Sequence, residues 1–160
     1  MGQRKRIEEK DVQDMILFYE AKGRWSIFSN FSYIKVFWKG RFWRTAEHAY
    51  HSEKFLRSHI KDEIFRAKTP EEAKKIAQKY KLLVRPDWRG VRRKIMEQIV
   101  SAKLKQHSYI QKRLLETGSK EIVEDSPRDD FWGRGPNWDG QNNMGKIWMK
   151  FRRQLRGKKK

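Results

Sequence analysis

Apolar residues recur every three to four positions through most of the second half of the chain, which is the period of helices that bury one face. Asp87 is a good N-cap for the longest of these stretches. The buried stripe expected after it consists of Val91, Ile95, Ile99 and Ala102. The pattern therefore predicts one long helix that starts near residue 88.

Shorter helices are expected on both sides of this long helix. Thr69, followed by Pro70 and two glutamates, is a capping box with proline at the first helical position. Ser108 can begin another helix that ends near Thr117, with Gly118 just beyond its C-cap. The last helix is expected over about 144–156, and its buried side chains are Ile147, Trp148, Phe151 and Leu155.

The first half of the chain has short apolar runs separated by polar residues and glycines. A strand is expected at 16–19, and a β-hairpin at 34–38 and 41–43 around Lys39-Gly40. Thr45 can cap a helix that runs from about Ala46 to Ser58. Three smaller features complete the prediction: a short helix within 8–15, a brief strand at 121–124, and a structured loop at 126–142.

These elements predict a mostly α protein with a small β-hairpin or sheet, which is the α+β class. No internal repeat or linker divides the chain. We expect a single domain over residues 16–156, preceded by a charged lead-in at 1–15 and followed by a basic tail at 157–160.

The charge balance favours a polyanionic partner. Among 160 residues, 39 are Lys or Arg and 20 are Asp or Glu, which gives a formal net charge of +19. Nucleic acid is the first candidate and an anionic membrane surface the second, although a solubility adaptation would give the same excess. The absence of cysteine excludes disulfides and cysteine nucleophiles. With no long apolar run and a charged N-terminus, the sequence predicts a cytoplasmic protein without a membrane partner.

One face of the helix after Thr45 carries the most informative chemistry. Residues at i, i+3, i+4 and i+7 share this face, and they are Glu47, Tyr50, His51 and Lys54. Four aromatic residues precede them: Phe37, Trp38, Phe42 and Trp43. Burial among aromatic rings displaces the pKa values of carboxylates and amines. We therefore interpret this face as a reaction site.

Other candidate sites leave alternatives open. The four histidines do not form an H-E-x-x-H pattern, so no metal is expected, and no nucleophile-elbow or phosphate-loop pattern occurs. The glycine-rich late loop either binds a phosphate at the following helix start or only connects two elements. Trp88 and Trp132 either stack against a ligand ring or pack in the core. Asp129 and Asp130 either cap a turn or supply a second catalytic carboxylate.

Four motifs in a fixed order resemble the NADAR family, also called YbiA-like. They are Phe28-Ser29-Asn30-Phe31, Glu47-His48 with Lys54, Asp129-x-x-Trp132-Gly133, and Gly140-x-Asn142-x-Met144-Gly145. The resemblance extends from Phe18 to Leu155. It implies a YbiA-like fold and an N-glycosidase that needs no cofactor and breaks a ribose C1–N bond. Family members either remove ADP-ribose from guanine in nucleic acid or cleave phosphoribosyl intermediates of riboflavin synthesis.

The resemblance also implies roles for particular residues. Glu47 matches the catalytic glutamate and Lys54 the helix lysine that acts with it. The implied substrate contacts are Ser29, Asn30, Phe31, Tyr50, Trp88, Asp129, Trp132, Gly133 and Asn142. His51 stands where the family commonly has Gln, so it receives no role.

The basic excess is not a general property of the family, and it favours ADP-ribosylated nucleic acid over a small riboflavin precursor as the substrate. An ADP-ribosyltransferase toxin is a further partner to consider. A non-catalytic module that binds ADP-ribose or nucleic acid is the third interpretation, and the presence of both Glu47 and Lys54 argues against it.

Overall fold

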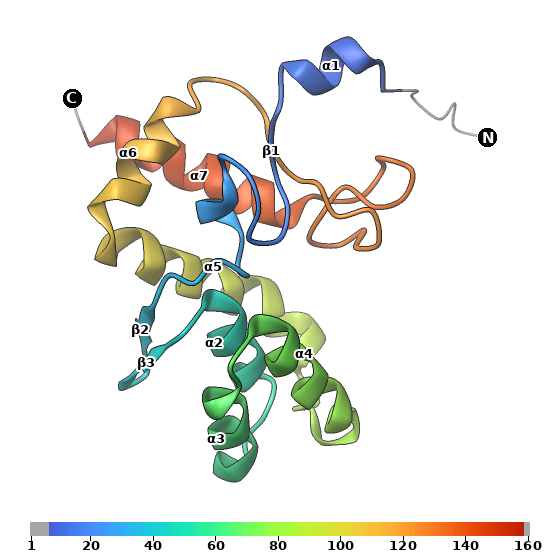
Figure 1. The fold of residues 1–160 in the computed structure, drawn as a ribbon, viewed down its shortest axis with the longest axis vertical. Helices are drawn as coiled ribbons and strands as arrows, with labels where there is room; N and C mark the ends of the chain where they lie inside the picture. Colours follow the sequence, from blue (N-terminus) through green and yellow to red (C-terminus); the bar gives the residue numbers. More distant parts are fainter. Residues whose placement is uncertain (1–6, 159–160) are drawn as a thin grey trace.

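The long helix α5 (Trp88–Gln106) is the element against which most of the molecule packs, as Figure 1 shows. The structure is a computed structural model that describes residues 7–158. Helices α2 (Ala46–Glu53), α6 (Ser108–Glu116) and α7 (Asn143–Gly157) contact α5, as does strand β2 (Val36–Trp38). The remaining helices are α1 (Glu9–Gln13), α3 (Ser58–Arg66) and α4 (Pro70–Lys79), with short 3-10 turns η1 (Ser26–Phe28) and η2 (Lys81–Leu83).

Two small sheets complete the fold and confirm the α+β class. Strand β2 pairs antiparallel with β3 (Arg41–Trp43), which is the expected hairpin. Strand β1 (Ile16–Phe18) pairs in parallel with β4 (Ile122–Glu124), with Ile16 opposite Ile122. The sequence pattern predicted both of these strands but not their pairing, which joins segments about a hundred residues apart.

The predicted helix starts agree with the structure where a side chain caps the first turn. Thr45 Oγ1 accepts the His48 N–H at 3.2 Å, and Thr69 Oγ1 accepts the Glu72 N–H at 3.1 Å. Asp87 precedes α5, but its carboxylate pairs with Arg85 and makes no cap hydrogen bond. The start of α5 therefore lies where expected without the expected capping interaction.

One helix boundary was predicted wrongly. The helix after Thr45 does not continue to Ser58: α2 ends at Glu53, Lys54 is its C-cap, and α3 begins at Ser58. The chain turns here because Phe55 is buried and the Lys54 carbonyl accepts the backbone N–H of Arg85 at 2.8 Å. A packing partner from a distant segment thus ends the helix, which local periodicity does not reveal.

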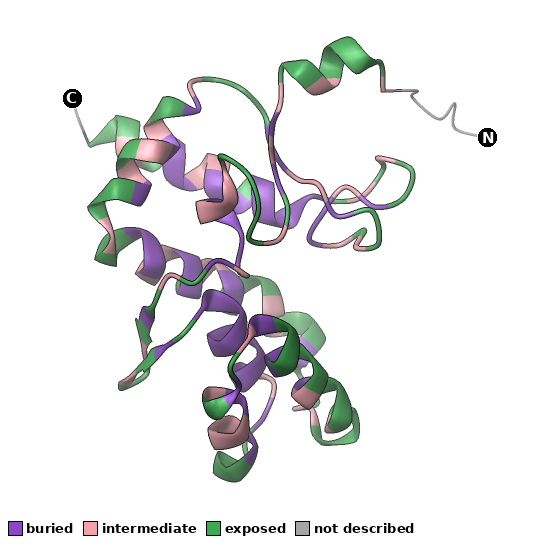
Figure 2. Cartoon of the chain, viewed as in Figure 1, coloured by how far each residue is buried: buried purple, intermediate pink, exposed green. Residues whose placement is uncertain are grey.

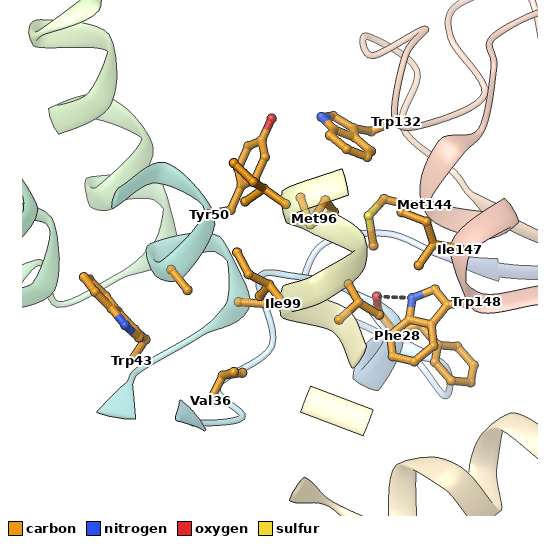
Figure 3. Packing of buried hydrophobic residues seen from close by; sticks show 14 of the residues in the cluster. Phe28, Val36, Trp43, Tyr50, Met96, Ile99, Trp132, Met144, Ile147 and Trp148 are labelled. Carbon is orange, nitrogen blue, oxygen red and sulfur yellow. Dashed lines mark hydrogen bonds between the residues drawn. The ribbon is translucent and has the colours of Figure 1, made fainter. Parts of the chain in front are cut away.

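The core lies along the inner faces of α2, α5 and α7, which are purple in Figure 2. Ile95 and Ile99 are fully buried as predicted, whereas Val91, Ala102 and Leu155 are only partly buried. The indole of Trp148 donates a 3.0 Å hydrogen bond to the Phe28 carbonyl, which fixes the loop before β2 against α7 (Figure 3). Within the described residues, no helix is both long and apolar enough to cross a membrane.

Candidate active site

A cavity of about 610 Å³ lies between α2, α4 and the loop that follows β4. Seven of the eleven residues predicted for the site line it: Ser29, Asn30, Phe31, Glu47, Tyr50, Asp129 and Trp132. They come from three separate segments of the chain. Further charged residues that were not predicted also face this space: Glu20, Glu71, Lys74, Lys75, Glu124 and Arg128.

Glu47 is held as an ionised carboxylate at the wall of the cavity. Its backbone N–H donates to the Asn30 carbonyl at 3.1 Å, and only 8% of the residue is exposed. Burial raises its pKa, but His51, Lys74 and Lys54 together outweigh that effect and leave the pKa below its usual value. The carboxylate is therefore charged at neutral pH.

His51 orients this carboxylate. Its Nε2 lies 2.7 Å from Glu47 Oε1, one turn along the same helix. Burial lowers the pKa of the imidazole, so His51 is neutral at pH 7. Because an ionised carboxylate only accepts hydrogen bonds, the ring proton lies on Nε2. The other nitrogen, Nδ1, is buried and has no partner in residues 7–158.

Lys54 lies two turns from Glu47 but beside the cavity rather than in its wall. Its Nζ is 5.5 Å from the ring centroid of Tyr50 and 5.8 Å from that of Trp88. Burial lowers the pKa of the amine, the charge of Glu47 opposes this shift, and Lys74 adds to it. Its side chain makes no ion pair with the described residues, so the aromatic rings are its main neighbours.

Tyr50 and two tryptophans form an aromatic wall. The Tyr50 ring is 5.1 Å from Trp88 and 5.7 Å, edge to face, from Trp132. Figure 3 shows the Tyr50 hydroxyl and the Trp132 indole on the same side of this group. Burial followed by the charge of Glu47 raises the pKa of Tyr50, so its phenol is neutral. Of the two tryptophans, Trp132 faces the cavity and Trp88 packs behind Tyr50.

The loop 29–31 is held in place by buried side chains that were not predicted from the sequence. The Asn30 amide nitrogen is 3.2 Å from the Met96 sulfur and 3.6 Å from the Met144 sulfur. Its Oδ1 is buried without a hydrogen-bond partner in the described structure. Lys103, which is 0% exposed, donates to the Ser29 carbonyl at 3.0 Å. Burial lowers the pKa of the Lys103 amine to about 7.

Glu124, at the end of β4, is the carboxyl group of the cavity lining whose pKa is raised most clearly. Burial, with further contributions from the charges of Asp129 and Glu47, raises its pKa to about 8. By surface area the residue is only partly buried, because its side chain borders the open space. Burial is the main cause of the raised pKa, and the negative charges of Asp129 and Glu47 act in the same direction. Glu124 is therefore protonated at neutral pH, while Glu47 is charged.

Asp129 acts as a turn cap. Its Oδ1 accepts the backbone N–H groups of Phe131 at 2.9 Å and Trp132 at 2.7 Å. Asp130 does not line the cavity. Of the alternatives that the sequence left open, the structure thus assigns Asp129 a capping role at the cavity edge and makes Glu124 the second carboxyl.

Besides Trp88, two predicted substrate contacts lie outside the cavity wall. Asn142 spans β4, accepting from the Glu124 N–H at 3.0 Å and donating to the Ile122 carbonyl at 2.9 Å. Gly133 packs so tightly that a Cβ would lie 2.8 Å from Ser126 Cβ and 2.9 Å from the Glu124 carbonyl. Both residues shape the strand and loop that carry Glu124, and neither lines the cavity.

The late loop is not a phosphate site at its helix start. The first N–H groups of α7, those of Asn143 and Met144, donate to the carbonyls of Phe131 and Trp132 at 3.1 Å. These donors are therefore occupied, so the loop connects elements and closes back on itself. Among residues 7–158, no group of three or more possible metal ligands was found.

The comparisons with known proteins agree with this geometry. The NADAR domain model matches residues 17–156. The chain belongs to the NADAR family. It is 38% identical over 144 residues to the N-glycosidase Npun_R5314 of Nostoc punctiforme, covering 88% of this chain and 92% of the relative. It is 32% identical over 145 residues to the N-glycosidase YbiA of Escherichia coli K12, covering 90% and 91%.

A solved structure of YbiA and one longer relative extend these comparisons. The solution NMR structure of Escherichia coli YbiA superposes with a TM-score of 0.82 at 31% identity, covering 91% of this chain and 86% of that one. This match confirms the predicted YbiA-like fold. The riboflavin biosynthesis protein VVA0006 of Vibrio vulnificus is 31% identical over 144 residues, which cover 90% of this chain but 39% of that longer protein.

Proposed function

We propose that the protein is an N-glycosidase that hydrolyses a ribose C1–N bond. The observation that carries this proposal is a charged carboxylate, Glu47, and a protonated carboxyl, Glu124, facing one cavity. Most glycosidases cleave the glycosidic bond with one protonated carboxyl group and one ionised carboxylate. Two relatives, Npun_R5314 and YbiA, are named N-glycosidases, which supports the same reaction class.

Each carboxyl has a defined task in this mechanism. Glu124 donates its proton to the leaving nitrogen as the C1–N bond breaks, so that the base departs as a neutral molecule. Glu47 stabilises the positive charge that develops at C1 and then accepts a proton from the water whose oxygen bonds to C1. His51 holds Glu47 in place through the 2.7 Å hydrogen bond from its Nε2 to Glu47 Oε1.

Lys54 allows a second route through the same cavity. As a neutral amine it would attack C1 of the ring-opened riboside, where C1 is doubly bonded to the base nitrogen, and would expel the base as a neutral amine. The Schiff base left between C1 and Lys54 is then hydrolysed by water to the free sugar and the free lysine amine. Its lowered pKa supports this role, whereas its place beside the cavity favours a counter-ion. Borohydride added during turnover separates the two. A covalent adduct on Lys54, found by mass spectrometry, would support the Schiff base, and an unmodified protein would leave direct attack by water.

For the substrate, we favour ADP-ribose attached to guanine in nucleic acid. Three bases at the cavity, Lys74, Lys75 and Arg128, make no ion pair with other described residues and suit a phosphorylated ribosyl group. The formal charge of +19 extends this preference to a polyanion. The runner-up is a phosphorylated riboflavin precursor, which the name of the Vibrio vulnificus relative supports.

A direct comparison of substrates tests the proposal. The protein is incubated in parallel with an ADP-ribosylated guanine oligonucleotide and with a phosphoribosyl riboflavin precursor, and released base and free sugar are measured by chromatography. Release from the oligonucleotide alone supports the preferred substrate, and release from the precursor alone supports the runner-up. If the folded protein binds ADP-ribose but cleaves neither compound, it is a binding module and the proposal is wrong.

A further inference from the structure

A second hollow lies on the side of α5 that faces away from the catalytic cavity. It has a volume of about 790 Å³ and extends along α5 from Gly90 to Gln106, with Phe151 of α7 at its edge. Met96 lines the catalytic cavity, whereas the next two residues, Glu97 and Gln98, line this second hollow. Successive helix residues point in directions about 100° apart, so α5 separates the two spaces. We call this hollow the α5–α7 groove.

The two helices beside the groove carry more than half of the net charge of the protein. On α5 the bases are Arg89, Arg92, Arg93, Lys94, Lys103 and Lys105. On α7 they are Lys146, Lys150, Arg152, Arg153 and Arg156. Glu97 is the one acid on either helix. These 34 residues therefore supply +10 of the formal +19. Lys103 and Arg152 are buried, and the other nine bases occupy partly or fully exposed positions on the two adjoining helices. Such a concentration of accessible bases is the electrostatic footprint of a polyanion site.

Few of these outward charges are neutralised inside the protein. Glu97 pairs with Lys150 and lies 3.7 Å from Arg93, which uses up the single acid. Lys94 and Lys105 are exposed and have no ion-pair partner within the described structure. They are eleven residues apart on α5, a distance of about 16 Å at the helical rise. One strand of nucleic acid places about five phosphates along that length.

An exposed aromatic pair stands at one end of the groove. The side-chain amide of Gln106 donates to the Phe37 carbonyl at 2.9 Å and accepts its N–H at 2.7 Å, which fixes the hairpin to the end of α5. Phe37 and Phe42 are register partners in the hairpin, with ring centroids 4.9 Å apart. They remain 45% and 63% exposed. Aromatic rings beside a basic groove are the arrangement on which unpaired bases stack.

We propose that the α5–α7 groove binds the phosphate backbone of a nucleic acid strand and that the Phe37–Phe42 pair stacks against an unpaired base at its hairpin end. This surface is separate from the catalytic cavity. Binding here requires no ADP-ribose on the nucleic acid and no turnover. The inference can therefore fail while the N-glycosidase proposal stands, and the reverse also holds.

Fluorescence anisotropy with a labelled, unmodified single strand tests the charged part of the surface. The variant Lys94→Glu/Lys105→Glu is compared with the matched control Lys68→Glu/Lys81→Glu. The control changes the net charge equally, at exposed positions just before α4 and in η2 after it. We expect the groove variant to weaken binding about tenfold or more, and the control by about twofold or less. Equal weakening by both variants would show that only total charge matters and would overturn the proposal.

The aromatic part has its own test. In the variant Phe37→Thr/Phe42→Thr, whose residues still suit a strand, single-strand binding should weaken about fivefold or more while duplex binding stays unchanged. An equal loss for both nucleic acids, or no loss for either, would contradict the stacking role. If the protein binds vesicles of anionic phospholipid through Lys94 and Lys105 but no nucleic acid, the partner is a membrane surface and the proposal is wrong.

Discussion

The inner side of α5 adjoins a cavity in which charged groups are buried and interact with one or two partners. The outer side of α5 carries exposed bases that make few ion pairs. Glu47, Glu124 and Lys103 belong to the inner region. Burial is the first cause of the pKa shifts of Glu124 and Lys103, whereas for Glu47 the effects of His51, Lys74 and Lys54 outweigh burial and lower the pKa. The α5–α7 groove belongs to the outer region. The difference shows that one chain uses charge in two ways. Buried charges have displaced pKa values suited to chemistry, and exposed charges attract a ligand over a distance.

The variant Glu47→Gln tests the inner region and has the largest expected effect. The amide keeps the size of the side chain but can neither stabilise a positive C1 nor accept a proton. We expect turnover to fall about 10⁴-fold, at the upper end of the range for one acid–base group. Turnover is measured by chromatography of the released base, and thermal unfolding checks the fold. Lys68→Glu/Lys81→Glu provides a charge-changed control that should retain full turnover. Activity retained by Glu47→Gln would remove this residue from the mechanism.

The variant Lys103→Met tests how much the buried amine on the inner side of α5 lowers the free energy of unfolding. The folded pKa of about 7 lies below the usual 10.5, so between these values the unfolded chain binds more protons and the wild type gains stability as the pH rises. Below pH 7 the buried amine is protonated and lowers the free energy of unfolding by its full amount, at most about 5 kcal/mol. Urea unfolding should therefore find the Met variant more stable at pH 6, with the gap narrowing towards pH 10. A gap that does not change with pH would mean that the amine titrates normally.

Glu124→Gln separates the proton donor from the nucleophile-activating carboxylate. Glu124 must be protonated to act, so wild-type turnover should fall as the pH rises through about 8. The variant should lose about 10²-fold at pH 7 and should no longer show this decline at high pH. Rates from pH 6 to 10 measure both effects. A variant with the same alkaline decline as the wild type would assign that decline to another group.

The variant Asn142→Gly tests how the strand that carries Glu124 is held in place. Asn142 has a left-handed backbone with φ of +50°, which glycine adopts freely, so the substitution removes two hydrogen bonds without adding strain. We expect a loss of about 1–3 kcal/mol in the free energy of unfolding. The fall in turnover at alkaline pH should also move to lower pH, because a less buried Glu124 has a less strongly raised pKa. Unchanged stability would show that these bonds contribute little to holding β4.

Much of the fold and part of the site could be predicted from local sequence. The caps at Thr45 and Thr69 and the hairpin depend on neighbouring residues, and Glu47 in the first turn of its helix follows from the Thr45 cap. Lys103 was missed although it continues the buried row of α5, four residues after Ile99. A lysine at such a position is usually assumed to reach solvent.

Glu124 and the role of His51 could not be predicted in this way. Glu124 gains its importance from the parallel pairing of β4 with β1 and from Asp129 and Glu47 around the same space, and all of these are contacts between distant segments. His51 shares a helix face with Glu47, so the sequence placed them together. Only the fold reveals that burial keeps the imidazole neutral and makes it a donor to Glu47.

The most direct test is to titrate Glu47 and Glu124 by ¹³C NMR on protein labelled at the glutamate side chains, with Glu47→Gln and Glu124→Gln used for assignment. One signal should titrate below the usual glutamate pKa, and the other at about 8. Two signals that both titrate near the ordinary value of 4.5 would contradict the paired acid and base from which the proposed glycosidase mechanism follows.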